Sequence, residues 1–306
     1  MKLGLLLSGE NYALSKAEAE SILGKAKGKK IVIVNARKPI LAKRLAFTRI
    51  AFEVLFESKL SNLDKSISNF NWNKHCKGTF SVRILNLSNY NAKAERYYGG
   101  LVWQKLKNPR VELNNPTTQF QIVFAEGKAF GCKVYWQNQE DFEARKAHKR
   151  PGFLPISLHP KLAKGCVNLL GMKCKKFIDP FCGSGGFLIE GALLGLKTEG
   201  WDISTRCVNS TKDNLKFFKK KAIVKKQDAL TLGKVNYLIT DLPYGRSTKL
   251  DKELYEKFFS LLRKKLNGTA VVMIPSTAKI PKGFKGKYFD YYIHKSLTKR
   301  ILILRK

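Results

Sequence analysis

The sequence predicts an α/β protein, in which a doubly wound and mostly parallel sheet follows a smaller α+β region. From residue 151 onward, short apolar runs alternate with segments of helical periodicity, as in parallel sheets with crossover helices. The last two apolar runs, 287–294 and 300–304, are separated by only five residues. Five residues are too few for a parallel crossover, so we expect the sheet to end in an antiparallel pair of strands.

The length and composition fit a folded protein of two or three domains. The chain has 306 residues, of which 44% are hydrophobic, enough for a substantial core. No run of about 18 apolar residues occurs, so no membrane span is expected. The apolar start, residues 1–7, lacks a signal-peptide cleavage site and is expected to form a strand of a cytoplasmic protein.

Cysteine spacing gives no sign of a metal site. The six cysteines form no Cys-x-x-Cys pair, so structural zinc is not expected. Most of them are expected to be buried thiols, with a bridge between Cys166 and Cys174 as an open alternative.

The strongest bulk signal is positive charge. The chain carries 58 Lys and Arg against 23 Asp and Glu, a net charge of +35. Residues 1–150 contain 27 basic and 12 acidic residues, and residues 151–306 contain 31 and 11, so the excess is not confined to a tail. Because phosphate neutralisation dominates nucleic-acid affinity, the charge indicates a polyanionic partner such as RNA. The alternative is a generally basic proteome.

Residues 1–56 are expected to form a small α+β unit without a catalytic constellation. Ser15 and Glu18 form a capping-box pattern for a helix that Gly24 ends. Strands are expected at Lys2–Leu7, 31–34 and 50–56. A second helix is expected at 39–47. Four lysines between residues 25 and 30 make a basic loop.

Residues 57–137 repeat this mixture. Helices are expected at 60–75 and 91–106, and strands at 80–85, 119–124 and 128–136. The last two strands form a hairpin around Ala125-Glu126-Gly127. Aromatic residues recur here at helical and strand spacing, which favours core packing over base stacking.

Residues 138–150 are charged and lack apolar periodicity, which is typical of a solvated linker. The main domain boundary is therefore placed there. The following domain, 151–306, should contain strands at 176–182, 198–203, 222–227, 235–241 and 269–274 before the final pair, and helices at 186–194, 205–220 and 252–266.

A glycine turn follows the first strand of this domain, in the run Asp179-Pro180-Phe181-Cys182-Gly183-Ser184-Gly185-Gly186. Glycines let the backbone approach a ligand closely. The run matches neither Gly-x-Gly-x-x-Gly nor a Walker loop, and Asp179 would repel a phosphate. It suits a ligand with a cationic, amino-acid-like part, such as S-adenosylmethionine.

Acidic residues end four successive strands of this domain: Asp179, Asp202, Asp228 and Asp241. Asp202 lies 23 residues after Asp179, in the range where an acid binds a ribose hydroxyl. Asp228 is placed to accept a hydrogen bond from an adenine amine. A single acid at a strand end is often only a cap, but a row of them in a very basic protein indicates a binding site.

The run Asp241-Leu242-Pro243-Tyr244 lies where the fourth strand ends. The Asp241 carboxylate, the Leu242 carbonyl and the Tyr244 ring are the parts of a clamp for a planar base with an exocyclic amine. The two acceptors would orient the amine, and the aromatic ring would stack on the base.

These motifs resemble those of a known family. Asp241-Leu242-Pro243-Tyr244 resembles the (Asn/Asp)-Pro-Pro-Tyr motif of amino-methylating enzymes. The run 150–163, with Pro160-Lys161-Leu162-Ala163 at its end, is similar to the signature of THUMP-domain RNA guanine-N2 methyltransferases, and Asn114-Asn115-Pro116 matches a THUMP turn. With Gly245-Arg246-Ser247, the clamp motif is most similar to the archaeal branch that modifies guanine 10 of tRNA.

The resemblance implies a class I methyltransferase (Rossmann-like) sheet, preceded by a ferredoxin-like unit (1–56) and a THUMP RNA-binding domain (57–137). The cofactor would be S-adenosylmethionine and the partner tRNA, with no protein partner or membrane required. The catalytic residues would be Asp241, Leu242, Pro243 and Tyr244. The cofactor-binding residues would be Phe153, Pro155, Ser157, Asp179, Phe181, Gly183, Gly185, Asp202, Ile203, Asp228 and Ala229.

Several alternatives stay open at this point. The same clamp could act on guanine 6 of tRNA or on a ribosomal guanine, and it could hold the N6 amine of adenine. An RNA-binding protein that has kept the fold without catalysis is the alternative of a different class. The number of methyl groups added, and whether Asp241 removes a proton or only orients the amine, also stay open.

Overall fold

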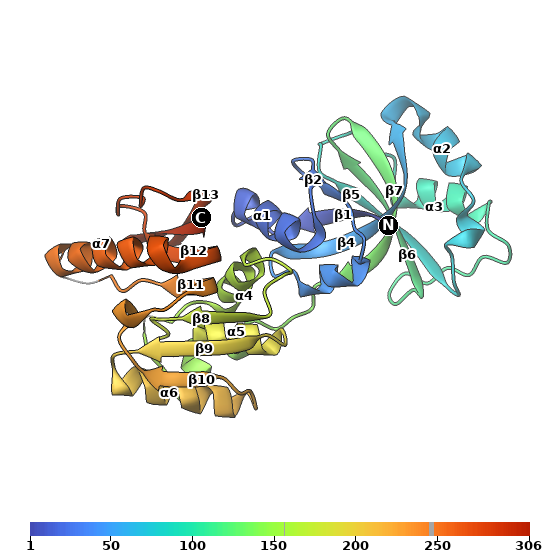
Figure 1. Cartoon of the computed structure of the whole chain (residues 1–306). Helices are drawn as coiled ribbons and strands as arrows, with labels where there is room; N and C mark the ends of the chain where they lie inside the picture. The colour runs from blue at the N-terminus through green and yellow to red at the C-terminus, as the bar shows by residue number, and fades with distance from the viewer. Residues whose placement is uncertain (156, 245–247) are drawn as a thin grey trace. The chain divides into compact units, whose positions relative to one another are not determined.

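The computed structural model describes residues 1–155, 157–244 and 248–306, with side chains omitted for 248–252. Ile156 and Gly245 to Ser247, which belong to the two motifs above, lie outside the described residues. The chain forms two compact units, residues 1–43 with 48–139, and residues 44–47 with 140–306 (Figure 1). Among the described residues, no helix combines the length and apolarity needed to cross a membrane.

The first unit is built on a seven-stranded sheet of order β2-β3-β1-β4-β7-β6-β5. The 12-residue strand β4 pairs with β1 on one side and β7 on the other, so one sheet runs through both regions expected before residue 138. The strands are β1 (Lys2–Leu7), β2 (Ala26–Lys27), β3 (Val32–Asn35), β4 (Thr48–Lys59), β5 (Phe80–Asn86), β6 (Thr118–Ala125) and β7 (Lys128–Gln137).

The hairpin of β6 and β7 confirms its prediction, with antiparallel pairing closed by Ala125 and Lys128. Its two-residue turn places Glu126 and Gly127 at positive φ, as a type I′ turn requires. Most of the aromatic side chains of this region pack as a core, as the sequence predicts, whereas Tyr97 and Trp103 are 39% and 51% exposed. Those that are at most 2% exposed are Trp72, Phe80, Tyr98, Phe120 and Phe124.

The first helix begins earlier than expected, and the other helical segments of the first unit are shorter than expected. Helix α1 (Tyr12–Leu23) is capped by Asn11, whose side chain accepts from the Leu14 N–H at 2.9 Å, so the capping box at Ser15 is wrong. Gly24 ends this helix as predicted. The other segments are η1 (Pro39–Arg44), η2 (Leu60–Asn62), α2 (Leu63–Asn69), η3 (Trp72–Lys74) and α3 (Glu95–Trp103).

The helix expected at 60–75 is interrupted for a local reason. Phe70 adopts an extended conformation that stops α2, and the indole N–H of Trp72 donates to the Ile67 carbonyl at 2.8 Å. The segment after Phe70 therefore folds back as a separate turn of 3₁₀ helix. At 39–47, only 3₁₀ turns form, at η1.

The second unit has a seven-stranded sheet of order β10-β9-β8-β11-β12-β14-β13 (Figure 1). Its strands are β8 (Lys176–Asp179), β9 (Lys197–Asp202), β10 (Ile223–Lys226), β11 (Val235–Asp241), β12 (Leu266–Pro275), β13 (Lys285–His294) and β14 (Leu297–Arg305). The first five pair in parallel, and β14 pairs antiparallel with β12 and β13. The antiparallel ending is thus confirmed, with the last strand inserted before the sixth.

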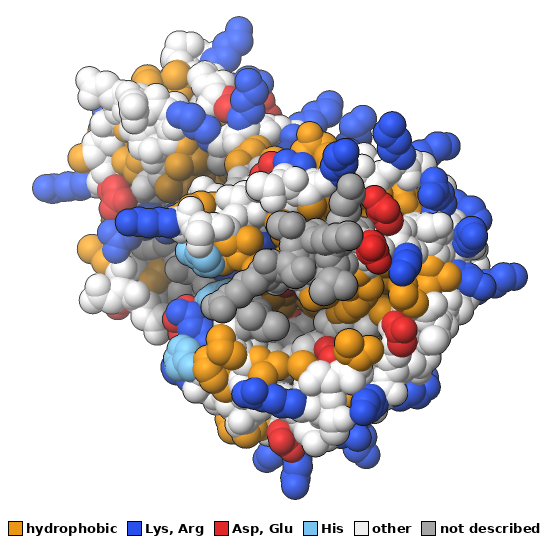
Figure 2. Space-filling model, turned by 90° about the vertical axis from the view of Figure 1, so that its left-hand side faces the viewer, with side chains coloured by type: hydrophobic (Ala, Val, Ile, Leu, Met, Phe, Trp, Pro, Cys, Tyr) orange, Lys and Arg blue, Asp and Glu red, His pale blue; other side chains and the backbone are white. Residues whose placement is uncertain are grey.

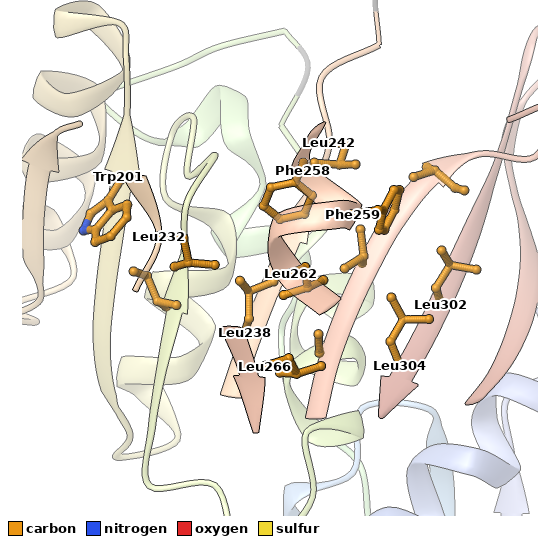
Figure 3. Packing of buried hydrophobic residues seen from close by; sticks show 14 residues of the cluster. Trp201, Leu232, Leu238, Leu242, Phe258, Phe259, Leu262, Leu266, Leu302 and Leu304 are labelled. Atoms are coloured by element: carbon orange, nitrogen blue, oxygen red, sulfur yellow. The ribbon is translucent and has the colours of Figure 1, made fainter. Parts of the chain in front are cut away.

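Helices flank this sheet, in the order that the sequence predicts. The predicted helices are α5 (Gly186–Leu193), α6 (Thr205–Phe217) and α7 (Thr248–Lys265), whereas the 3₁₀ turn η6 (Ala229–Thr231) was not predicted. A further helix, α4 (Pro160–Leu169), precedes β8 and was not predicted, although His159 caps it and Pro160 starts it. Helix α7 places an apolar stripe on the sheet, where Phe258, Phe259 and Leu262 pack against residues of β11, β12 and β14 (Figure 3).

The expectation of a solvated linker at 138–150 is wrong for two of its cations, Arg145 and Arg150, which have little solvent exposure. Arg145 is 14% exposed and pairs with both carboxylate oxygens of Glu190 in α5, at 2.9 and 3.0 Å. Its guanidinium also binds Glu140 at 2.6 Å, and Glu140 in turn pairs with Lys164 of α4. Arg150 is only 4% exposed. The segment therefore combines two poorly exposed arginines, one of them in an ion-pair network, with exposed charges such as Asp141, Glu143 and Lys149.

Candidate active site

The predicted row of acids lies along one edge of the sheet of the second unit. Asp179, Asp202 and Asp241 are the last residues of β8, β9 and β11, and Asp228 follows β10 by two residues. Because these strands are parallel, their carboxyl ends meet at the same edge, which is where open α/β sheets bind ligands. The structure thus brings together residues that are up to 62 positions apart in the sequence.

Asp179 lies beneath the glycine turn and connects β8 to β11. Its Oδ1 accepts from the backbone N–H of Phe181 at 3.1 Å and from the Thr240 hydroxyl at 2.7 Å. The side chain is 2% exposed, and this burial raises the pKa of Asp179 to about 7, with smaller contributions from the charges of Asp241 and Asp202. A cation bound beside Asp179 would favour its ionised form.

Asp202 holds the backbone of the glycine turn from the neighbouring strand. Its Oδ2 accepts from the Gly183 N–H at 3.0 Å, and its Oδ1 accepts from the Ser204 N–H at 2.9 Å. Gly183 has a φ of +52° and Gly185 begins α5 as its N-cap. No described atom lies within 4 Å of the position that a Cβ on Gly183 would take, so the turn borders open space.

Asp228 and its neighbours lie further along the edge. Asp228 is exposed and accepts from the Leu230 N–H at 2.8 Å, which makes it the cap of η6. Ile203 is 70% exposed at the end of β9, whereas Ala229 is buried. Ile203 therefore gives this edge an apolar surface as well as acceptors.

The segment before α4 reaches the same glycine turn. Asn214 of α6 anchors it, because its amide donates to the carbonyls of Gly152 and Ser184 and its oxygen accepts from the Gly152 N–H. Ser157 bonds the Ser184 hydroxyl at 2.6 Å. The expected cofactor residues Phe153 and Pro155 are exposed on this segment, and Phe181 packs edge-on against Phe258 at 5.3 Å.

Asp241 carries two oxygens with different surroundings. Its Oδ2 pairs with the ammonium group of Lys299 from β14, whose side chain is 2% exposed. Its Oδ1 is buried and has no hydrogen-bond partner among the described residues. Burial raises the pKa of Asp241, while the charge of Lys299 opposes that rise. One carboxylate oxygen is therefore fixed by the protein, and the other remains to accept from a ligand.

The same lysine contacts the aromatic part of the clamp. The ammonium nitrogen of Lys299 lies 4.4 Å from the centroid of the Tyr244 ring, within cation–π range. Tyr244 is 38% exposed, and burial together with the Asp241 charge raises the pKa of its phenol. The exposed part of the ring is free to stack on a base.

Leu242 and Pro243 fix the backbone of the clamp. The Leu242 N–H donates to the Met273 carbonyl at 3.0 Å, and the Leu242 side chain is fully buried beside Phe258 (Figure 3). The Pro243 carbonyl accepts from the Tyr255 hydroxyl at 2.9 Å. Leucine in place of the commoner first proline of the motif thus adds an apolar anchor under the Leu242 carbonyl.

The residues along this edge fit S-adenosylmethionine. A cationic amino-acid part would suit the acid at Asp179, a ribose diol suits Asp202, and an adenine suits the apolar surface of Ile203 with the acceptor of Asp228. The open space above Gly183 would admit such a ligand against the backbone. Among the described residues, no three His, Cys, Asp or Glu side chains gather as a metal site.

Sequence reasoning missed several residues that build this site. Lys299, Thr240 and Asn214 are buried polar groups, and only Lys299 gave a readable signal. It has the same strand parity as the apolar Ile301 and Ile303, so a lysine was placed on the inward face of β14. Cys174, for its part, is a buried thiol that donates to the Lys176 carbonyl at 3.5 Å, so the bridge left open to it is not formed.

Comparison with known proteins is consistent with this geometry. The RMKL-like methyltransferase domain family matches residues 147–296. The crystal structure of TrmN from Thermus thermophilus superposes with a TM-score of 0.56 at 17% identity, covering 100% of both chains. At that identity the likeness establishes the fold, a class I methyltransferase sheet after an N-terminal α/β region.

Two sequence relatives are more specific. The tRNA (guanine(10)-N2)-dimethyltransferase of Methanothermobacter thermautotrophicus is 32% identical over 278 residues, which cover 85% of this chain and 82% of the relative. The enzyme of the same name from Methanocaldococcus jannaschii is 34% identical over 252 residues, covering 74% and 71%. Likeness at this level over most of both chains shows that the protein belongs to the tRNA (guanine(10)-N2)-dimethyltransferase family.

Proposed function

We propose that this protein transfers a methyl group from S-adenosylmethionine to the exocyclic N2 amine of guanine 10 in tRNA, in the cytoplasm. The observation that carries the proposal is the Asp241 carboxylate, which has one oxygen held by buried Lys299 and the other oxygen without a partner among the described residues. A free buried acceptor next to an exposed aromatic ring suits an N–H donor on a planar base. Family membership selects guanine in tRNA among such bases.

The chemistry requires the nitrogen to be oriented, because its lone pair is delocalised into the guanine ring. S-adenosylmethionine supplies a methyl group on a positively charged sulfur. Oδ1 of Asp241 accepts one N–H, and the Leu242 carbonyl accepts the other, so the lone pair turns out of the ring plane. Both acceptors stabilise the positive charge that develops on nitrogen, and alignment supplies the proximity term.

Tyr244 and Lys299 complete the clamp. The Tyr244 ring stacks on the base, and Lys299 contacts both the Asp241 carboxylate and the Tyr244 ring. The charge of Lys299 lowers the pKa of Asp241 against the rise caused by burial, which favours the ionised, accepting form before transfer. After transfer, the nitrogen loses a proton to Asp241 or to water.

The RNA is proposed to contact both units. A guanine in a stem must leave its base pair to reach a pocket of this kind. Lys and Arg side chains are numerous on the face shown in Figure 2, as phosphate binding requires. The first unit, with its basic loop of residues 25–30, would bind tRNA in the manner of a THUMP domain.

The test is digestion and mass spectrometry of tRNA transcripts that the purified protein has methylated. Guanosine methylated on N2 at position 10, lost when that guanine alone is replaced, is the expected result. Modification of guanine 6, of ribosomal RNA or of adenine N6 would support one of the alternative substrates. Absence of any transfer, with cofactor bound, would support a non-catalytic RNA-binding role. The same spectra count the methyl groups.

A further inference from the structure

A cavity lies beside the clamp residues 241–244, and Tyr244 belongs to both. Its volume is about 820 Å³, and it lies between α7, the segment that follows β12 and the turn between β13 and β14. Tyr244, Tyr255 and Phe259 contribute aromatic rings to its lining, and Arg263, Lys279 and Lys282 contribute cations. None of the four acids of the strand edge lines it, so it is distinct from the expected cofactor site.

The cations of this cavity are available to a ligand. Arg263, Lys279 and Lys282 are exposed, and none of them forms an ion pair with a described residue. Glu256 is the acidic residue among those that line the cavity. A local excess of positive charge at a concave surface attracts an anionic ligand such as a phosphate.

The backbone at Gly283 is shaped around one of these cations. Gly283 has a φ of +83°, and a Cβ there would lie 2.9 Å from Nη1 of Arg263 and 3.0 Å from its Cδ. Any larger residue would therefore be strained and would push the guanidinium away. The arginine is thus packed against the segment after β12.

The aromatic wall is tied to the catalytic backbone. The Tyr255 hydroxyl donates to the Pro243 carbonyl at 2.9 Å, and the Tyr255 ring packs edge-on against Phe259 at 6.4 Å. The wall is therefore positioned relative to Tyr244 by a hydrogen bond and by packing. Tyr244 and Tyr255 are at least partly exposed and can stack on a base, whereas Phe259 is 7% exposed and packs in the core beside them.

We propose that this cavity binds the nucleotide next to the target guanine on the RNA strand, with its base on the aromatic wall and its phosphate at Arg263 and Lys282. The proposal rests on the proposed function. A base that leaves its stem at Tyr244 carries its neighbours to the mouth of the clamp. The cavity adjoining Tyr244 has both kinds of group that a nucleotide needs, an aromatic face and free cations.

Photocrosslinking tests where the neighbouring nucleotide lies. A tRNA transcript with 4-thiouridine in place of the nucleotide on one side or the other of guanine 10 is bound to the full-length protein, irradiated and digested. We expect crosslinked peptides from residues 253–263 or 275–282 for one of the two positions. Crosslinks that map elsewhere for both positions would overturn the proposal. Because crosslinking needs binding and no methyl transfer, it tests the cavity even if the proposed reaction fails.

Charge reversal tests the phosphate contact. In Arg263→Glu and Lys282→Glu, we expect the KM for tRNA to rise about tenfold and the slope of log affinity against log salt to fall by about 1. The kcat at saturating tRNA and the affinity for S-adenosylmethionine should match the wild-type values. Lys216→Glu, which makes the same charge change on exposed α6, is the matched control. If Arg263→Glu and Lys282→Glu show the same KM and salt slope as Lys216→Glu, the phosphate site is refuted.

Discussion

Lys299 and Asp241 form a buried ion pair between the last strand and the end of β11. The lysine side chain is 2% exposed and the aspartate 18%, and the partners are 58 residues apart in sequence. Lys299 pairs across the sheet with Pro275 of β12, and Asp241 pairs with Met273 of the same strand. The antiparallel insertion of β14 therefore delivers a cation to the clamp, which gives this ending of the sheet a chemical role.

Replacing Lys299 should change the pH dependence of transfer. Lys299→Met removes the cation that opposes the burial-driven rise in the pKa of Asp241, so this pKa rises further. As the pH falls, the ionised form of Asp241 is then lost at a higher pH than in the wild type. We expect the acidic limb of the plot of kcat against pH to move to higher pH, so that the variant loses more of its kcat at pH 6 than at pH 9. Lys299→Arg should keep the wild-type limb. An equal loss at all pH values would indicate a purely structural role.

Removing the Asp241 carboxylate should separate chemistry from cofactor binding. Asp241→Ala removes the free acceptor, and we expect kcat to fall by about 10³-fold with little change in cofactor affinity. Asp202→Ala should instead weaken cofactor affinity, measured by calorimetry, because Asp202 lies at the ribose position and holds the Gly183 N–H. Persistent labelled-methyl incorporation in Asp241→Ala would contradict the assignment.

Asp241→Asn distinguishes orientation from proton removal. The amide oxygen still accepts an N–H but is far less basic than a carboxylate. If orientation is the main role, Asp241→Asn should retain at least about tenfold more activity than Asp241→Ala, since one acceptor survives. Equal losses, compared by single-turnover transfer to tRNA, would assign Asp241 the proton.

Cofactor affinity should depend on pH through Asp179. The pKa of Asp179 is raised to about 7 by burial, and the ionised form is the one that attracts a cationic amino group. Affinity should therefore rise with pH from 5 to 7, by up to tenfold per unit, and level off above 7. Thr240→Val removes a hydrogen bond that stabilises the ionised form, so it should move this transition to higher pH. Calorimetry in buffers of different ionisation enthalpy would detect the proton released on binding.

What could be predicted from the sequence follows from how each feature is encoded. The strands and the acids at their ends are local patterns, so Asp179, Asp202 and Asp241 were found where the structure places them. Lys299 depends on which strand β14 inserts beside, and Asn214 depends on the packing of α6 under a distant loop. The helix expected at 60–75 is broken by a local contact that helical periodicity does not encode, the hydrogen bond from the Trp72 indole to the Ile67 carbonyl five residues earlier. Long-range partners of polar side chains were thus the unpredictable part.

Arg145 provides the final prediction, for stability. Its side chain is 14% exposed and pairs with Glu190, which is 1% exposed, so Arg145→Met leaves a buried carboxylate without its main partner. Loss of one member of such a pair costs about 3 to 5 kcal/mol of unfolding free energy. It should appear as a lower midpoint of thermal unfolding of the full chain.

The pH dependence of this loss is specific to Glu190. Burial already raises the pKa of Glu190, and loss of Arg145 raises it further. A carboxyl whose folded pKa exceeds its unfolded value stabilises the fold when protonated, so the deficit of Arg145→Met should shrink as pH falls from 7 toward 5. Adding Glu190→Gln to Arg145→Met should restore part of the midpoint at pH 7, because the uncompensated charge is removed. A deficit that is independent of pH and unchanged in the double variant would mean that Arg145 acts through packing alone.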